Sequence, residues 1–184
     1  MDLTLHSSVE GYFKELLDEA IHERNLKVSP TTEYYLVGLL GELTKSSWSD
    51  DALALKLAGA SDPAERVGAL KEVGDTSLVL SGLFSSSLQR SVVQVDYYIG
   101  LGGAAYKELS TRLRASSVSE VYRELAAKFP KFVDVLASVR QQFLIGENDA
   151  VSLYENWKTK KLDWVEKRLE DLGMLVGGDK GTLQ

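Results

Sequence analysis

Hydrophobic residues recur at helical spacing along most of this 184-residue chain. The longest series alternates steps of four and three residues, which place its members on one face of an α-helix. Its members are Leu88, Val92, Val95, Ile99, Gly102, Tyr106, Leu109 and Leu113. A second series runs from Tyr122 to Phe143 and is interrupted by Pro130, where we expect a kink or two abutting helices. The two series predict long helices over about 88–113 and 118–143.

The first half of the chain carries further helical signals. Residues 9–24 have an apolar face and follow two serines that can cap a helix, and Pro30 suits the first turn of the next helix. A short helix is predicted over 50–58, although the alternation of its leucines also permits a strand. The segment Ser61-Asp62-Pro63 is a typical helix start, and the helix that it opens should extend to about Phe84.

These patterns together predict an all-α fold. We expect a single globular domain over residues 1–176, with seven to nine helices around a central antiparallel pair, 88–113 and 118–143. The segment Ser117-Val118-Ser119-Glu120 fits a capping box at the start of the second of these helices. Shorter helical patterns continue to Gly173, and residues 177–184 form a polar, glycine-rich tail that we expect to be flexible.

The glycine cluster in the first long series has two interpretations. The run Gly100-Leu101-Gly102-Gly103-Ala104-Ala105 follows an apolar stretch and matches G-x-G-x-x-A, a pattern typical of dinucleotide-binding loops. The helical register continues through it without interruption, however, and Asp96 would lie inside the required buried strand. We therefore expect Gly102 to lie on a packing face, beneath an aromatic side chain such as Phe129 or Phe132. The alternative is a ligand pocket over this notch, lined by Tyr98, Gly102, Gly103 and Tyr106.

Two pairs of adjacent tyrosines stand out in the predicted helices, Tyr34-Tyr35 and Tyr97-Tyr98. Neighbouring residues on a helix point about 100° apart, so one tyrosine of each pair can enter the core while the other remains peripheral. A peripheral tyrosine suits a partner interface or the rim of a pocket.

Two acids in the helix that Pro63 opens suggest a metal site. Glu72 and Asp75 are three residues apart, so both carboxylates can reach one Mg²⁺ from the same helix face. The run LKEVGDTSLVLSGL resembles the E-x-x-D helix of the all-α NTP pyrophosphatases of the MazG and dimeric dUTPase type. That resemblance implies magnesium-dependent nucleotide hydrolysis, with Glu42 as a further acid, but Leu39 stands where the family's second upstream acid is expected. We therefore favour the simpler interpretation, an amphipathic helix with a solvated acidic face.

The composition narrows the classes of function. A net charge of −6 argues against a nucleic-acid-binding face, and no apolar run approaches the ~20 residues of a membrane span. The absence of cysteine excludes disulfides, thiol catalysis and cysteine-based zinc sites, and fits a cytoplasmic protein. The two histidines, His6 and His22, lack the spacing of metal ligands, and we expect both to be exposed. No cofactor is predicted.

Three stretches, LKEVGDTSLVLSGLF, VVQVDYYIGLGGAAY and FPKFVDVLASVR, resemble an uncharacterised family of bacterial proteins with no assigned activity. The resemblance implies a bacterial, cytoplasmic protein and transfers no catalytic residue. Three functions remain open on the sequence. The first is a non-enzymatic interaction or regulatory protein that binds another protein or itself. The second is a sensor with a small-molecule pocket near Gly102 and Gly103, and the third is a hydrolase built on Glu42, Glu72 and Asp75.

Overall fold

The computed structural model describes residues 8–43, 53–85 and 94–143, and all regular structure in these ranges is helical. The helices are α1 (Val9–Glu23), α2 (Pro30–Glu42), α3 (Leu53–Gly59), α4 (Pro63–Leu83), α6 (Val95–Arg112), α7 (Ser119–Ala127) and α8 (Phe129–Phe143). The all-α prediction is therefore confirmed, and α3 settles the choice between helix and strand in its segment. In the described ranges, no helix is both long enough and apolar enough to cross a bilayer. Residues 88–93, His6, the helices expected beyond residue 148 and the tail over 177–184 lie outside the described residues.

Side-chain caps fix where three of the helices begin. Ser8, Ser29 and Asp62 each accept a hydrogen bond from a backbone N–H in the first turn of α1, α2 and α4, and proline follows directly in the last two. The capping box predicted at Ser117 is wrong. The N-cap of α7 is Val118, with no side-chain cap, because the turn before it already bonds the Ser119 N–H to the Ser116 carbonyl.

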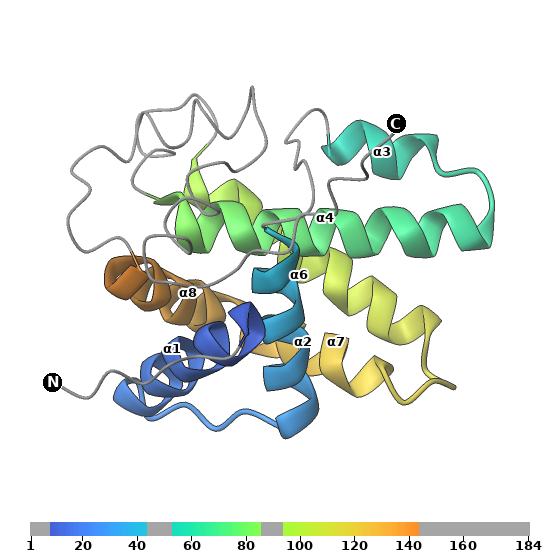
Figure 1. The fold of residues 1–184 in the computed structure, drawn as a ribbon. Coiled ribbons are helices and arrows are strands. Elements are labelled where there is room, and N and C mark those ends of the chain that lie inside the picture. Colours follow the sequence, from blue (N-terminus) through green and yellow to red (C-terminus); the bar gives the residue numbers. More distant parts are fainter. Residues whose placement is uncertain (1–7, 44–52, 86–93, 144–184) are drawn as a thin grey trace, which may run out of the picture.

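The centre of the molecule is α4, which crosses it with α3 on one side and α1, α2 and α8 on the other (Figure 1). Every residue from Val73 to Phe84 is buried, so this half of α4 is covered on all faces. Its most extensive contact is with α6, more so than the contact between α6 and α7. The predicted partner helix over 118–143 is divided at Lys128, because Pro130 has no N–H to continue the helical hydrogen bonds.

Close approach of the central helices depends on glycine. A Cβ added to Gly102 would lie 2.4 Å from Cζ of Phe129 and 2.6 Å from Cβ of Ser77. The prediction that an aromatic side chain covers Gly102 is thus confirmed. Gly74 on α4 has the same role for Tyr106, whose ring would lie 2.4 Å from an added Cβ.

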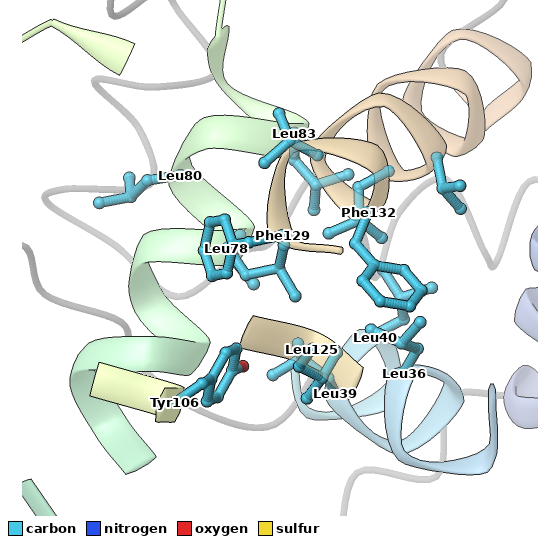
Figure 2. Close-up of a cluster of buried hydrophobic side chains, with 14 of the residues drawn as sticks. Leu36, Leu39, Leu40, Leu78, Leu80, Leu83, Tyr106, Leu125, Phe129 and Phe132 are labelled. Carbon is cyan, nitrogen blue, oxygen red and sulfur yellow. The ribbon is translucent and has the colours of Figure 1, made fainter. Parts of the chain in front are cut away.

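One hydrophobic core joins the helices that surround α4. Figure 2 shows leucines of α2 and α4 converging with side chains of α6, α7 and α8. The labelled members are Leu36, Leu39, Leu40, Leu78, Leu80, Leu83, Tyr106, Leu125, Phe129 and Phe132. This core holds both α2 and α4, which form the walls of the cleft described next.

Candidate ligand-binding cleft

A cleft of about 890 Å³ lies between α2, α4 and the turn before α7, and we call it the α2–α4 cleft. Its volume falls in the range of small-molecule sites, roughly 300–1,000 Å³. The lining combines apolar, aromatic and charged side chains. It consists of Pro30, Thr31, Tyr34, Tyr35, Gly38, Leu39, Glu42, Gly68, Lys71, Glu72, Asp75, Thr76, Ser117, Val118 and Val121.

Helix α2 forms one wall of the cleft through its helical periodicity. Tyr34, Gly38 and Glu42 are spaced four residues apart, so they lie along one exposed stripe of the helix. Leu36 and Leu40 lie on the opposite face and are buried in the core. One face of α2 therefore holds the helix in place while the other remains open to the cleft.

The floor of the cleft contains a buried carboxylate with three hydrogen-bond donors. Asp75 of α4 is only 4% exposed. Its Oδ1 accepts hydrogen bonds from the hydroxyls of Tyr35 (2.5 Å) and Tyr106 (2.7 Å), and its Oδ2 accepts one from Nζ of Lys71 (2.6 Å). A buried carboxylate needs such partners, because an unpaired charge in the interior is strongly unfavourable. We call Tyr35, Lys71, Asp75 and Tyr106 the Asp75 cluster.

Aromatic contacts hold the donors of the Asp75 cluster in place. The ring of Tyr122 in α7 stacks on Tyr106, with 5.7 Å between centroids, and meets Tyr35 edge-on at 5.5 Å. The ammonium of Lys71 lies 5.6 Å from the centroid of the Tyr35 ring, a distance that allows a cation–π interaction. The cluster thus joins α2, α4, α6 and α7 beneath the cleft.

Burial and charge shift the pKa values of the three donors to Asp75, which are Tyr35, Tyr106 and Lys71. Burial raises the pKa of Tyr35, and the charge of Asp75 raises it further; the same two causes raise the pKa of Tyr106. Burial by itself lowers the pKa of Lys71, but the carboxylates of Asp75 and Glu42 outweigh it and leave the pKa raised. At neutral pH the tyrosines therefore remain hydroxyl donors and the lysine remains an ammonium.

The three acids considered as magnesium ligands all line the α2–α4 cleft, but their environments differ. Glu42 and Glu72 are exposed, and Glu72 pairs with Lys56 of α3. Asp75 is buried, so the expectation of a solvated acidic face is wrong for this residue. No group of three or more metal-ligating side chains is arranged to hold a metal ion within the described ranges. Both Asp75 oxygens already have donors, and the Lys71 ammonium would repel a divalent cation.

The structure shows what surrounds each of the four residues named for the alternative pocket at the glycine notch. Phe129 fills the space beside Gly102 and touches the position of an added Cβ at Gly103 as well, which counts against a pocket there. Tyr98 is buried with its ring edge-on to the exposed Tyr97. The Tyr106 hydroxyl donates to Asp75, so Tyr106 lies beneath the floor of the α2–α4 cleft and is not one of its lining residues. His22 is exposed, as predicted.

Sequence reasoning had weak signals for the residues that build this site. Lys71 and Asp75 are four residues apart, a spacing that predicts an ion pair on one helix. The tyrosine pair at 34–35 indicated one buried and one peripheral ring, and Tyr34 is indeed 81% exposed. Nothing local connects Tyr35 with Asp75, which lie 40 residues apart.

Comparison of the chain with protein-family models, with curated proteins and with solved structures gave no match. The function is therefore inferred from the geometry of the α2–α4 cleft alone.

Proposed function

We propose that this protein is a non-enzymatic, cytoplasmic regulatory protein that binds a small organic molecule in the α2–α4 cleft. One observation carries the proposal: an open cleft of about 890 Å³ stands over a floor whose polar groups are already paired with one another. Such a floor is preformed, so binding does not require the Asp75 cluster to be rearranged. The cytoplasmic location is supported by the cysteine-free sequence.

The chemistry of the Asp75 cluster favours binding over catalysis. A general base needs a free acceptor directed at the substrate. Both oxygens of Asp75 instead accept hydrogen bonds from neighbours, and the raised pKa values of Tyr35 and Tyr106 keep these phenols protonated. The cluster is thus suited to fixing the shape of the cleft and the position of Lys71.

Native mass spectrometry of the protein purified from its own host tests the proposal. Gly38 lines the cleft, is exposed and has open space where a Cβ would be, so Gly38→Trp should fill the cleft without disturbing the core. Gly100 in α6 is equally exposed and open but does not line the cleft, which makes Gly100→Trp the matched control. We expect a small molecule to be retained by the wild type and by Gly100→Trp, and lost from Gly38→Trp. Equal retention by both variants would place the ligand outside the cleft.

A second candidate function is association with another protein or with a second copy of the chain. It is favoured by large hydrophobic side chains on the surface: Tyr34 is 81% exposed, Leu55 71% and Tyr97 47%. Leu55 lies on α3, away from the residues that line the cleft. Light scattering during size-exclusion chromatography should give a dimer mass that Leu55→Ser reduces to the monomer mass. A monomer mass for the wild type across the micromolar range would exclude self-association.

A further inference from the structure

We infer that the ligand of the α2–α4 cleft is an uncharged compound with an aromatic body and a carbonyl-type oxygen that accepts a hydrogen bond from Lys71. This inference rests on the proposed function and adds the chemical class of the ligand. It is carried by the unused donors of the Lys71 ammonium, by the contacts that hold this ammonium in place, and by the apolar side chains that line the cleft beside it.

The Lys71 ammonium has more hydrogen-bond donors than it uses within the described part of the chain. An ammonium group carries three N–H donors. One of them is directed at Oδ2 of Asp75, at 2.6 Å, and among the described residues Asp75 is the only acceptor bonded to this nitrogen. The Lys71 side chain lines the cleft and is 52% exposed. The other two donors can therefore serve a molecule bound in the cleft.

Contacts with Asp75 and Tyr35 hold the Lys71 ammonium in position. The ion pair with Asp75 joins residues four apart on α4, and Asp75 is itself held by the hydroxyls of Tyr35 and Tyr106. The centroid of the Tyr35 ring lies 5.6 Å from the Lys71 nitrogen. A lysine side chain normally loses rotamer freedom when it binds a ligand, and here part of that loss has already occurred on folding. Lys71 is thus a preorganised donor.

Helix α4 leaves space for a ligand atom beside Lys71. Gly68, Lys71 and Asp75 line the cleft at spacings of three and four residues, which place them on one face of the helix. Gly68 is exposed, and outside its own helix backbone and chain neighbours no described atom lies within 4 Å of the position that its Cβ would take. A ligand oxygen can therefore approach the Lys71 nitrogen along α4 without meeting a side chain at position 68.

Desolvation requires the ligand to provide an acceptor. A molecule that covers Lys71 removes water from its free N–H donors, and a charged donor left without an acceptor is strongly unfavourable. A carbonyl-type oxygen replaces the lost hydrogen bond. A ligand carboxylate would replace it as well, but it would lie close to the Asp75 carboxylate on the same nitrogen, and like charges at that separation repel each other. An uncharged acceptor is therefore favoured.

Apolar side chains of α2 and of the start of α7 line the cleft beside this donor. Leu39 and Val121 line it from largely buried positions, and Pro30 and Val118 line it at the first residues of the two helices. The ring of Tyr34, which is 81% exposed, adds aromatic surface. Such groups favour a ligand that buries apolar area against them, as an aromatic ring does. An aromatic body with one oxygen acceptor therefore fits both the apolar lining and Lys71.

Three probes of similar size test the acceptor: acetophenone, nitrobenzene, whose oxygens are weaker hydrogen-bond acceptors, and the anion benzoate. Ligand-observed NMR measures their dissociation constants for the full-length protein. We expect acetophenone to bind about threefold to tenfold tighter than nitrobenzene, the ratio that one net hydrogen bond implies, and benzoate to bind more weakly than acetophenone. Equal affinities for acetophenone and nitrobenzene, or a preference for benzoate, would overturn the inference and leave the proposed function standing. If none of the three binds, the inference fails, and ligand retention in native mass spectrometry judges the proposed function separately.

A pair of lysine variants assigns the preference to Lys71. Lys71→Met keeps the apolar part of the side chain and removes the donors, so it should bring the affinity for acetophenone close to that for nitrobenzene. Lys56→Met is the matched control, because Lys56 also pairs with an acid of the cleft, Glu72, but does not line the cleft itself. It should retain the difference between the two probes. An acetophenone preference that survives Lys71→Met would contradict the assignment. Circular dichroism shows whether both variants fold, and the wild-type affinities decide the inference if Lys71→Met does not.

Discussion

Gly102 lies where α6 packs closely against Ser77 of α4 and Phe129 of α8. An added methyl group would lie 2.4 Å from Phe129, closer than non-bonded carbon atoms can approach, so the neighbours would have to move. We predict that Gly102→Ala lowers the free energy of unfolding by about 1–3 kcal/mol. Gly100→Ala, on the exposed face of the same helix, should raise it by about 0.5–1 kcal/mol through helix propensity. Urea unfolding followed by circular dichroism measures both; a stabilising Gly102→Ala would show that Phe129 does not fill the notch.

A substitution at Tyr106 tests how much the Asp75 cluster contributes to stability. Its hydroxyl donates to Asp75 Oδ1 from a fully buried position, so Tyr106→Phe removes one donor from a buried carboxylate and leaves the ring in place. The expected loss of stability is about 1.5–3 kcal/mol, the range for hydrogen bonds to charged groups. Tyr97→Phe is the control, since that tyrosine is half exposed and not part of the cluster. Equal unfolding midpoints for the two variants would mean that the Tyr106 hydroxyl contributes no net stability.

At the scale of whole helices, Glu124 joins α7 to the start of α2. Its carboxylate accepts hydrogen bonds from the Ser29 hydroxyl at 2.6 Å and from Lys128 at 2.7 Å. Burial alone would raise the pKa of Glu124, but these hydrogen bonds outweigh it and lower the pKa to about 2, from an ordinary value of 4.5. The ionised form is therefore favoured by folding, and its contribution to stability is present above pH 4.5 and is lost as the pH falls toward 2.

This linkage gives a pH-dependent prediction. Glu124→Gln should be less stable than the wild type at neutral pH, and the difference should shrink as the pH is lowered from about 4.5 to 2. Glu120→Gln changes an exposed acid on the same helix that pairs with the exposed Arg123, and it should have a small effect. Thermal unfolding of the three proteins across this pH range provides the comparison. A difference between Glu124→Gln and wild type that stays constant down to pH 2 would contradict the role given to the carboxylate.

The helices themselves could be predicted from sequence because their signals are local. Ser8 and Asp62 cap the helices they were expected to open, Pro30 begins α2 as expected, and Pro130 divides the helix it was expected to interrupt. The burial of the second half of α4, from Val73 onward, on all faces could not be predicted in this way. Glu72 and Asp75 suggested one solvated face, whereas Asp75 is buried by tyrosines 40 and 31 residues away in the chain. Pairings over such separations follow from the packing of the whole domain.

For the molecule as a whole, the same distinction between local signals and long-range contacts determines how much of the site could be predicted from the sequence. The three acids considered as metal ligands do line one cleft. The spacing of Lys71 and Asp75 indicates an ion pair, but nothing local in the sequence indicates that the hydroxyls of Tyr35 and Tyr106 also donate to Asp75. The α2–α4 cleft lies between two helices that are separate in the sequence, and the residues on its walls have the pattern of ordinary helix surface. At the glycine notch, Phe129 occupies the space that the alternative of a ligand pocket would require, because side chains pack closely against small residues in the core.

Glycine amide resonances test the central claim most directly when the small molecule that native mass spectrometry identifies is titrated into the protein. Gly38 and Gly68 line the α2–α4 cleft, whereas Gly100 and Gly103 lie on α6 outside it. A two-dimensional ¹H–¹⁵N NMR spectrum of the full chain observes all four at once. We predict that the Gly38 and Gly68 signals shift in a saturable manner while those of Gly100 and Gly103 remain in place. Unchanged Gly38 and Gly68 signals, or shifts confined to Gly100 and Gly103, would contradict the α2–α4 cleft as the binding site.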